Sequence, residues 1–339
     1  AEDAGPLAHP VRPSSYMEIS NFYTTTIYEK GAEVVRMYHT LLGPDAFRQG
    51  TDLYFDRHDG TAATTDDFAS AMAEAGQIDL TQFKRWYEQP GTPNVHVEES
   101  FASGMLTLKI TQSPADLPNG DKHQPFHMPL ALGLIDSDGS NLSIDVHSLD
   151  SSASTSLRDG GKTLLLGAKE RESTLQIANL AEKPVVSFLR EFSAPVKVHH
   201  ERDSTELAFL VQHDTDGFVR WDAMQTLWIE HFDEAVTNAV DPVKTLGELA
   251  KGALRQESPE QQLLAATMLA IPNENYLFEQ LRNFDVDALL DARVAAVERT
   301  ALVHQPIWAG LVERHGGAGA YAADAAGMAR RALGNVAFA

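Results

Sequence analysis

The sequence contains no cysteine, which excludes disulfides, thiolate metal ligands and cysteine nucleophiles together. No stretch approaches the ~20 consecutive apolar residues that a membrane-spanning helix requires, and the first residues form neither a basic leader nor an apolar run. We therefore expect a soluble protein with no membrane association, and we assign it to the cytoplasm.

Basic residues are scarce: 27 lysines and arginines stand against 48 aspartates and glutamates, which gives a net charge of −21. A negative field of this size repels nucleic-acid phosphates and anionic lipid headgroups. We therefore exclude nucleic acid as a partner. The same field attracts the cationic amino terminus of a peptide, although an acidic surface also serves solubility alone.

The motifs of common hydrolases are absent. Zinc peptidases usually place two histidines one helical turn apart, as His-Glu-x-x-His, and this pattern does not occur. The nearest approach is His199-His200-Glu201, where Ser204 stands at the position of the second ligand and the pattern predicts the end of a strand. There is no Gly-x-Ser-x-Gly elbow and no glycine-rich phosphate loop. The sequence thus predicts no metal site within this chain.

A length of 339 residues, against ~100–200 for a usual domain, predicts two or three folding units. Residues 1–92 carry a helical pattern. Apolar residues recur at three- and four-residue steps over 29–43, where Gly43-Pro44 ends the helix. Further helices are expected over 45–58 and 80–88, and Thr64 supplies a hydroxyl cap for a helix between them.

After residue 92 the spacing of the apolar residues changes from three or four positions to two. Apolar and polar residues alternate in short runs, which predicts about seven half-buried strands in a small sandwich over 93–199, with turns such as Asn119-Gly120 between them. The expected strands lie at 95–97, 106–110, 130–134, 164–166, 175–177, 185–189 and 196–198.

From about residue 200 to 339 the pattern is helical again and rich in alanine. Helices are expected over 218–240, 244–255 and 260–270, with shorter ones to the end, and no repeat is strong enough to name a solenoid family. The fold class predicted is therefore multidomain α+β: a helical segment, an all-β sandwich and an α-helical array.

The stretch 21–35 (NFYTTTIYEKGAEVV) holds the one candidate for catalysis. Tyr28 stands at the entry of a helix, where its hydroxyl can donate a hydrogen bond to an oxyanion that develops during a reaction. On physical grounds alone, a tyrosine in the core or at an interface is the commoner outcome.

Three stretches, in this order and spacing, resemble bacterial aminopeptidase N, a family of zinc metallopeptidases of the gluzincin type. They are Tyr28-Glu29-Lys30-Gly31, residues 58–68 (HDGTAATTDDF) and residues 86–93 (WYEQPGTP). Residues 191–196 (EFSAPV) and 216–223 (DGFVRWDA) are weaker matches, and the resemblance fades through the helical tail.

The resemblance implies roles for particular residues. Tyr28 would hydrogen-bond the tetrahedral intermediate of peptide hydrolysis, and Asn21 and Tyr23 would line the substrate cleft. It also implies that residues 1–92 are the carboxy-terminal part of a thermolysin-like catalytic domain, followed by a sandwich at 93–199 and the start of a helical domain at 200–339.

The same resemblance places the zinc ligands and the general base upstream of residue 1, and it implies truncation at both ends. We therefore expect zinc in the parent enzyme and no cofactor in this chain alone. The expected partners are peptide substrates and the missing upstream catalytic half, and the isolated chain is expected to be inactive.

Two other interpretations stay open. The sandwich and helices could form a non-catalytic module for protein interaction. A different hydrolase with an unrecognised site is the other alternative, and the sequence offers no catalytic constellation for it.

Overall fold

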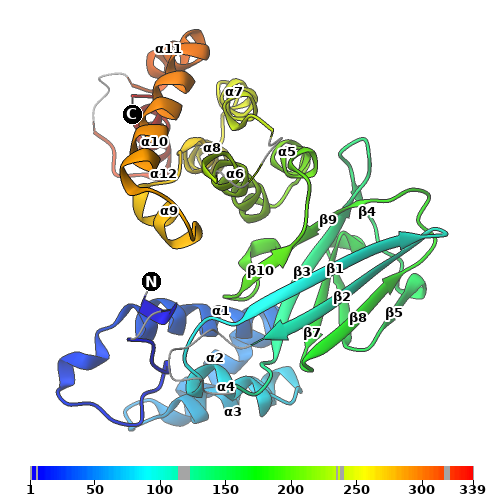
Figure 1. Ribbon diagram of the computed structural model, residues 1–339. Coiled ribbons are helices and arrows are strands. Elements are labelled where there is room, and N and C mark those ends of the chain that lie inside the picture. Colours follow the sequence, from blue (N-terminus) through cyan, green and yellow to red (C-terminus); the bar gives the residue numbers. More distant parts are fainter. Residues whose placement is uncertain are drawn as a thin grey trace. The chain divides into compact units, whose positions relative to one another are not determined.

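The computed structural model describes residues 2–4, 7–113, 123–233, 236, 240–316 and 321–338 (Figure 1). The chain divides into two compact units, Ala1–Glu201 and Arg202–Ala339. The first unit contains the helical segment and the sandwich, and the second is the helical array, so the predicted fold class is confirmed. The turn expected at Asn119-Gly120 lies outside the described residues. The boundaries after residues 92 and 199 stay a prediction.

The helical segment follows its local signals closely. Gly43 adopts φ 79°, a conformation that favours glycine, and ends the first α-helix, while Pro44 occupies the first turn of the next. Thr64 forms a capping box with Asp67, as the hydroxyl cap predicted. The elements are η1 (Glu2–Ala4), η2 (Ile19–Phe22), η3 (Thr26–Lys30), α1 (Gly31–Leu42), α2 (Pro44–His58), α3 (Thr65–Gly76), η4 (Gln82–Lys84) and α4 (Arg85–Glu88).

The expected helix over 80–88 is instead a 3-10 turn followed by a single α-turn. Tertiary packing accounts for the difference. The Trp86 indole is fully buried, its ring centroid lies 4.3 Å from that of Phe126, and its Nε1 donates to the carbonyl of His127 at 2.9 Å. The segment therefore docks onto the sandwich through an aromatic side chain.

Ten strands form the sandwich in the described part of the chain: β1 (Asn94–Ala102), β2 (Met105–Ser113), β3 (Met128–Ile135), β4 (Asn141–Leu142), β5 (Leu149–Ser151), β6 (Ser154–Arg158), β7 (Thr163–Ala168), β8 (Glu172–Ile177), β9 (Val185–Phe188) and β10 (Lys197–His200). One sheet has the order β10-β1-β2-β8-β5, with β10 parallel to β1. The other has the order β4-β3-β7-β6, and β9 also pairs with β3.

The expectation of half-buried strands holds for β2 and β8 but is wrong for β3, in which every residue is buried. Leucines at 130, 132 and 134 are fully buried, and the residues between them are covered as well. Helix α1 and the η7 turn (Arg190–Phe192) both contact this strand. An alternating sequence therefore did not reveal that the strand is covered on both sides.

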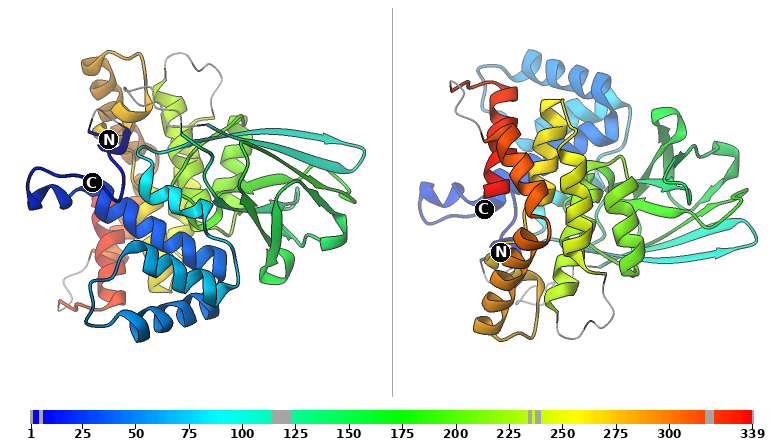
Figure 2. Two further views of the ribbon diagram at one scale, coloured as in Figure 1. Left: turned by 90° about the horizontal axis from the view of Figure 1, so that it is seen from below. Right: turned by 90° about the horizontal axis from the view of Figure 1, so that it is seen from above.

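The second unit consists of eight helices within the described residues, coloured green to red in Figure 2: α5 (Ser204–His213), α6 (Gly217–Phe232), α7 (Pro242–Ala253), α8 (Pro259–Leu269), α9 (Glu274–Gln280), α10 (Val286–Val303), α11 (Gln305–His315) and α12 (Ala325–Phe338). Six of them, α5 to α10, begin after an aspartate, asparagine or serine whose side chain accepts a backbone N–H.

Three details of the array differ from expectation. Helix α5 was not predicted. Helix α6 ends at Phe232 rather than near residue 240, and part of the stretch beyond it lies outside the described residues. The final helices are not all short, since α10 has 18 residues. None of the described helices is both long and apolar enough to cross a membrane.

Candidate functional site

Tyr28 lies in a single π-helical turn, η3, directly before α1. Its backbone N–H donates to the carbonyl of Thr24 at 3.1 Å, and the Thr24 hydroxyl accepts the N–H of Ile27 at 3.1 Å. The Tyr28 side chain is 57% exposed. Isolated π turns occur often at functional sites, and this one presents a phenol to the solvent rather than to the core.

The other two predicted site residues lie just before this turn. The Tyr23 ring stacks on that of Tyr28, with centroids 5.9 Å apart and planes 18° apart, so the structure brings the two tyrosines together. Asn21 is exposed, and its side-chain oxygen accepts the N–H groups of Met17 and Glu18, each at 3.1 Å. The Asn21 carbonyl is therefore engaged with its own loop.

A buried ion pair lies beneath the turn. Lys30, the last residue of η3, is 8% exposed; its Nζ donates to Asp3 Oδ2 at 3.0 Å and to the carbonyl of Gly91 at 2.8 Å. Asp3 also accepts the N–H of Gly91 and the hydroxyl of Thr92, each at 2.9 Å. Burial lowers the pKa of Lys30, and the charge of Asp3 opposes that shift.

Glu2 supports the opposite end of the turn. Its Oε2 accepts the N–H of Thr25 at 3.0 Å, and its Oε1 lies 3.3 Å from Nε2 of His9. Two consecutive carboxylates, Glu2 and Asp3, thus hold the two ends of the segment that carries Tyr28. Sequence reasoning missed both residues, because no spacing rule links positions 2 and 3 to positions 25 and 30.

Helix α1 is also fixed to the sandwich. Arg36 donates to the carbonyls of Glu191 and Phe192, and its guanidinium carbon lies 5.6 Å from the centre of the Phe192 ring. Leu189, Glu191 and Phe192 have φ of 63°, 58° and 49°, in the left-handed region that non-glycine residues rarely adopt. The weak sequence match at 191–196 therefore lies partly in a strained turn that receives α1.

Zinc does not fit the residues that the structure describes. No group of three or more histidine, aspartate or glutamate side chains among them could hold a metal ion. His199 and His200 are the last residues of β10, as predicted, and helix α5 begins at Ser204. The His199 ring stacks on His96, with 4.6 Å between centroids, and its Nε2 lies 2.9 Å from Asn94 Oδ1.

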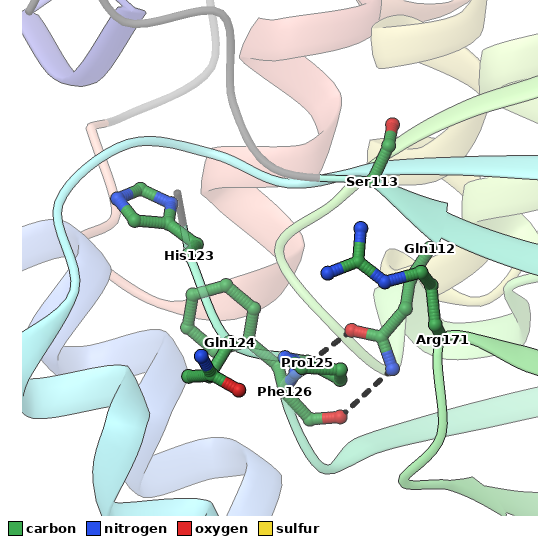
Figure 3. Close-up of a pocket in the computed structure, with 7 residues that line it drawn as sticks. All are labelled: Gln112, Ser113, His123, Gln124, Pro125, Phe126 and Arg171. Carbon is green, nitrogen blue, oxygen red and sulfur yellow. Dashed lines mark hydrogen bonds between the residues drawn. The ribbon is translucent and has the colours of Figure 1, made fainter. Parts of the chain in front are cut away.

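Two hollows lie away from Tyr28, one in each unit. The pocket beside Gln112, whose lining residues are drawn in Figure 3, has a volume of about 10 Å³, near the lower limit for one water molecule. The Gln112 amide there bonds the N–H and carbonyl of Phe126 and the carbonyl of Glu170, which is a structural role. A cavity of about 620 Å³ in the helical unit is lined by acidic, basic, amide and apolar side chains from α5 to α8 and the turns beside them.

Comparison with known families accounts for nearly the whole chain. Residues 1–87 match the peptidase family M1 domain, residues 91–201 match a domain of unknown function with an Ig-like fold, and residues 204–339 match a domain of unknown function with ARM repeats. These three matches describe a protein with the carboxy-terminal end of an M1 peptidase domain, then an Ig-like sandwich, then an ARM-type helical array.

Individual relatives narrow this class. The chain is 38% identical to aminopeptidase N of Escherichia coli over 309 residues, covering 89% of this chain and 34% of that protein. It is 41% identical to aminopeptidase N of Caulobacter vibrioides over 345 residues, covering 99% of this chain and 37% of that protein. The chain is a relative of aminopeptidase N, and it spans about a third of the length of these relatives.

A solved structure supports the fold. Aminopeptidase A of Legionella pneumophila, crystallised in complex with aspartic acid, aligns with a TM-score of 0.80 at 23% identity. The alignment covers 100% of this chain and 37% of that one.

Proposed function

We propose that this chain is part of a zinc-dependent aminopeptidase that removes the amino-terminal residue from peptides, and that Tyr28 stabilises the oxyanion of the tetrahedral intermediate. The observation that carries the proposal is an exposed tyrosine in a π turn whose two ends are held by Glu2 and Asp3. The turn lies within a segment that matches the M1 peptidase domain. Relatives named aminopeptidase N in two bacteria support the reaction class.

The chemistry assigned to Tyr28 is a hydrogen bond made as the reaction proceeds. When a nucleophile attacks the scissile carbonyl, its oxygen gains negative charge, and a phenol O–H placed beside it donates to that charge. Stacking on Tyr23 restricts the plane of the Tyr28 ring, and the 57% exposure leaves the ring edge accessible to a substrate. Asn21 and Tyr23 would line the cleft that holds the peptide.

Because this chain spans about a third of the length of its aminopeptidase N relatives, we propose that the zinc ligands and the general base belong to the part of the complete enzyme that this chain does not cover. We assign this chain one catalytic residue, Tyr28. Peptide substrates and the upstream catalytic half are its proposed partners. The cytoplasmic location and the division at residues 92 and 199 stay predictions.

The test is Tyr28→Phe in the complete gene product that contains this segment, assayed on alanine and leucine arylamides. The substitution keeps the ring and removes only the hydroxyl, so kcat should fall by ~10²–10³ with little change in KM, as when an interaction is made mainly in the transition state. Tyr16→Phe is the matched control, because Tyr16 is also 57% exposed in the same segment; its kcat should equal that of the wild type.

A wild-type kcat in Tyr28→Phe, with zinc content unchanged, would remove Tyr28 from the mechanism. A complete gene product that binds zinc poorly and hydrolyses no arylamide would instead favour the non-catalytic interaction module.

A further inference from the structure

The Lys30 side chain is placed unusually for a charged group. Of the five residues of the π turn, only Thr26 and Lys30 are buried, and Lys30 reaches away from the surface that displays Tyr28. A buried ion pair adds little net stability, because the loss of hydration offsets most of the attraction between the charges. Its fixed hydrogen-bond geometry, however, restricts how the attached backbone can move.

The anchor for this pair is the backbone of Gly91. Its N–H donates to one oxygen of Asp3, its carbonyl accepts from Lys30, and the other Asp3 oxygen binds both Lys30 and Thr92. Gly91 has φ 80°, which a residue with a side chain adopts only with strain. The π turn is thereby attached to the short connection that leads into strand β1.

Packing alone does not hold the Tyr28 ring in place. The ring is more exposed than buried, and Tyr23, which stacks on it, is itself 72% exposed. The position of the phenol therefore depends on the backbone of the turn. Contacts from Glu2 to Thr25 and from Asp3 to Lys30 restrain that backbone at both ends.

We propose that Lys30 and Asp3 are positioning residues for Tyr28: their ion pair, tied to Gly91, holds the π turn so that the phenol meets the oxyanion. This inference rests on the proposed function of Tyr28. A displacement of about 1 Å at a reacting centre costs about 10²-fold in rate. Loss of the pair is therefore expected to lower turnover although neither residue touches the substrate.

The test is a double-mutant cycle in the complete zinc-loaded gene product, combining Lys30→Met with Tyr28→Phe. Lys30→Met alone should lower kcat by about 10–10² with KM little changed. In the Tyr28→Phe background the same substitution should have no further effect, because there is no hydroxyl left to position. Asp3→Asn should behave like Lys30→Met, and Lys30→Arg should recover part of the rate.

The control is Lys109→Met, which removes an exposed lysine that pairs with Glu172 on the sandwich; its kcat should match the wild type. Hydrogen exchange gives a readout independent of turnover: amides of residues 24–31 should exchange about tenfold faster in Lys30→Met and at the wild-type rate in Tyr28→Phe. Asp3→Asn makes the smaller change and serves if Lys30→Met fails to fold.

The outcomes separate the two proposals. If Lys30→Met and Asp3→Asn lower kcat equally in both backgrounds, or leave kcat and exchange unchanged, the positioning role is refuted while Tyr28 keeps its own. If Tyr28→Phe retains the wild-type kcat, the proposed function fails and the positioning role fails with it.

Discussion

Arg190 offers the sharpest test of what holds the sandwich together. It is 4% exposed, and its guanidinium donates to Ser187 Oγ at 2.7 Å, to the carbonyl of Lys162 at 2.9 Å and to Asn141 Oδ1 at 2.5 Å. It also lies so close to Gly133 of β3 that a Cβ added there would overlap the Arg190 guanidinium. One side chain thus connects β9, β4 and the turn before β7 across the face of β3.

The cost of Arg190→Met follows from the burial of the acceptors. Ser187 is fully buried, so its hydroxyl loses the N–H of Arg190 as donor and gains no water, at a cost of about 1–3 kcal/mol. Lys162, Asn141 and Thr163, whose hydroxyl accepts from Arg190 at 3.2 Å, are not buried, so water replaces part of each lost bond and the net cost is about 0.5–1.5 kcal/mol apiece. We expect the unfolding free energy of the first unit to fall by about 3 kcal/mol.

Chemical unfolding by urea, with hydrogen exchange of β3 and β9 peptides, measures this loss where it occurs. Arg48→Met is the control, because Arg48 is 78% exposed and pairs with Asp52 at the surface; no measurable change is expected. An unfolding free energy within about 0.5 kcal/mol of wild type in Arg190→Met would refute the reasoning. Gly133→Ala gives a second check, since its clash should disappear in an Arg190→Ala background.

The remaining predictions concern pH and activity. Burial, assisted by the positive charge of Lys169, lowers the pKa of His127 from 6.5 to about 4. Between these two pH values only the unfolded chain binds the proton, so the free energy of unfolding should keep its full value above pH 6.5 and fall by about 3 kcal/mol as the pH drops to 4. A His127→Gln variant should lose this part of the pH dependence. The isolated 339-residue chain should not hydrolyse alanine or leucine arylamides with added zinc, because the proposed metal ligands lie upstream; turnover that a chelator abolishes would contradict this.

The parts of the fold that the sequence predicted well are those with local signals. Gly43 and Pro44 separate α1 from α2, and Thr64 begins α3, because each acts on its own backbone. Strands β1 and β2 alternate visibly because one face of each is covered and the other is less so.

The missed elements lack such signals. Strand β6 has no buried residue, so its sequence carries no alternation of apolar and polar residues to detect. Helix α5 begins only four residues after β10 ends, and its aspartate cap, Asp203, lies within a run of charged and polar residues. In both cases the hydrophobic period, which is the main clue in a single sequence, was too weak to use.

The contacts that hold the candidate site were even harder to predict from the sequence than the missed strand and helix. Tyr28 could be singled out because the Tyr-Glu-Lys-Gly stretch resembles a known family, but the residues that hold it are spread along the chain. Lys30 lies 27 positions from Asp3 and 61 from Gly91, separations that no periodicity connects. A long-range polar anchor of this kind arises only when the tertiary fold brings the groups together, and its buried members then must satisfy one another. The sequence therefore predicts the residue that would meet the substrate, whereas the geometry that would make it useful is visible only in the folded chain.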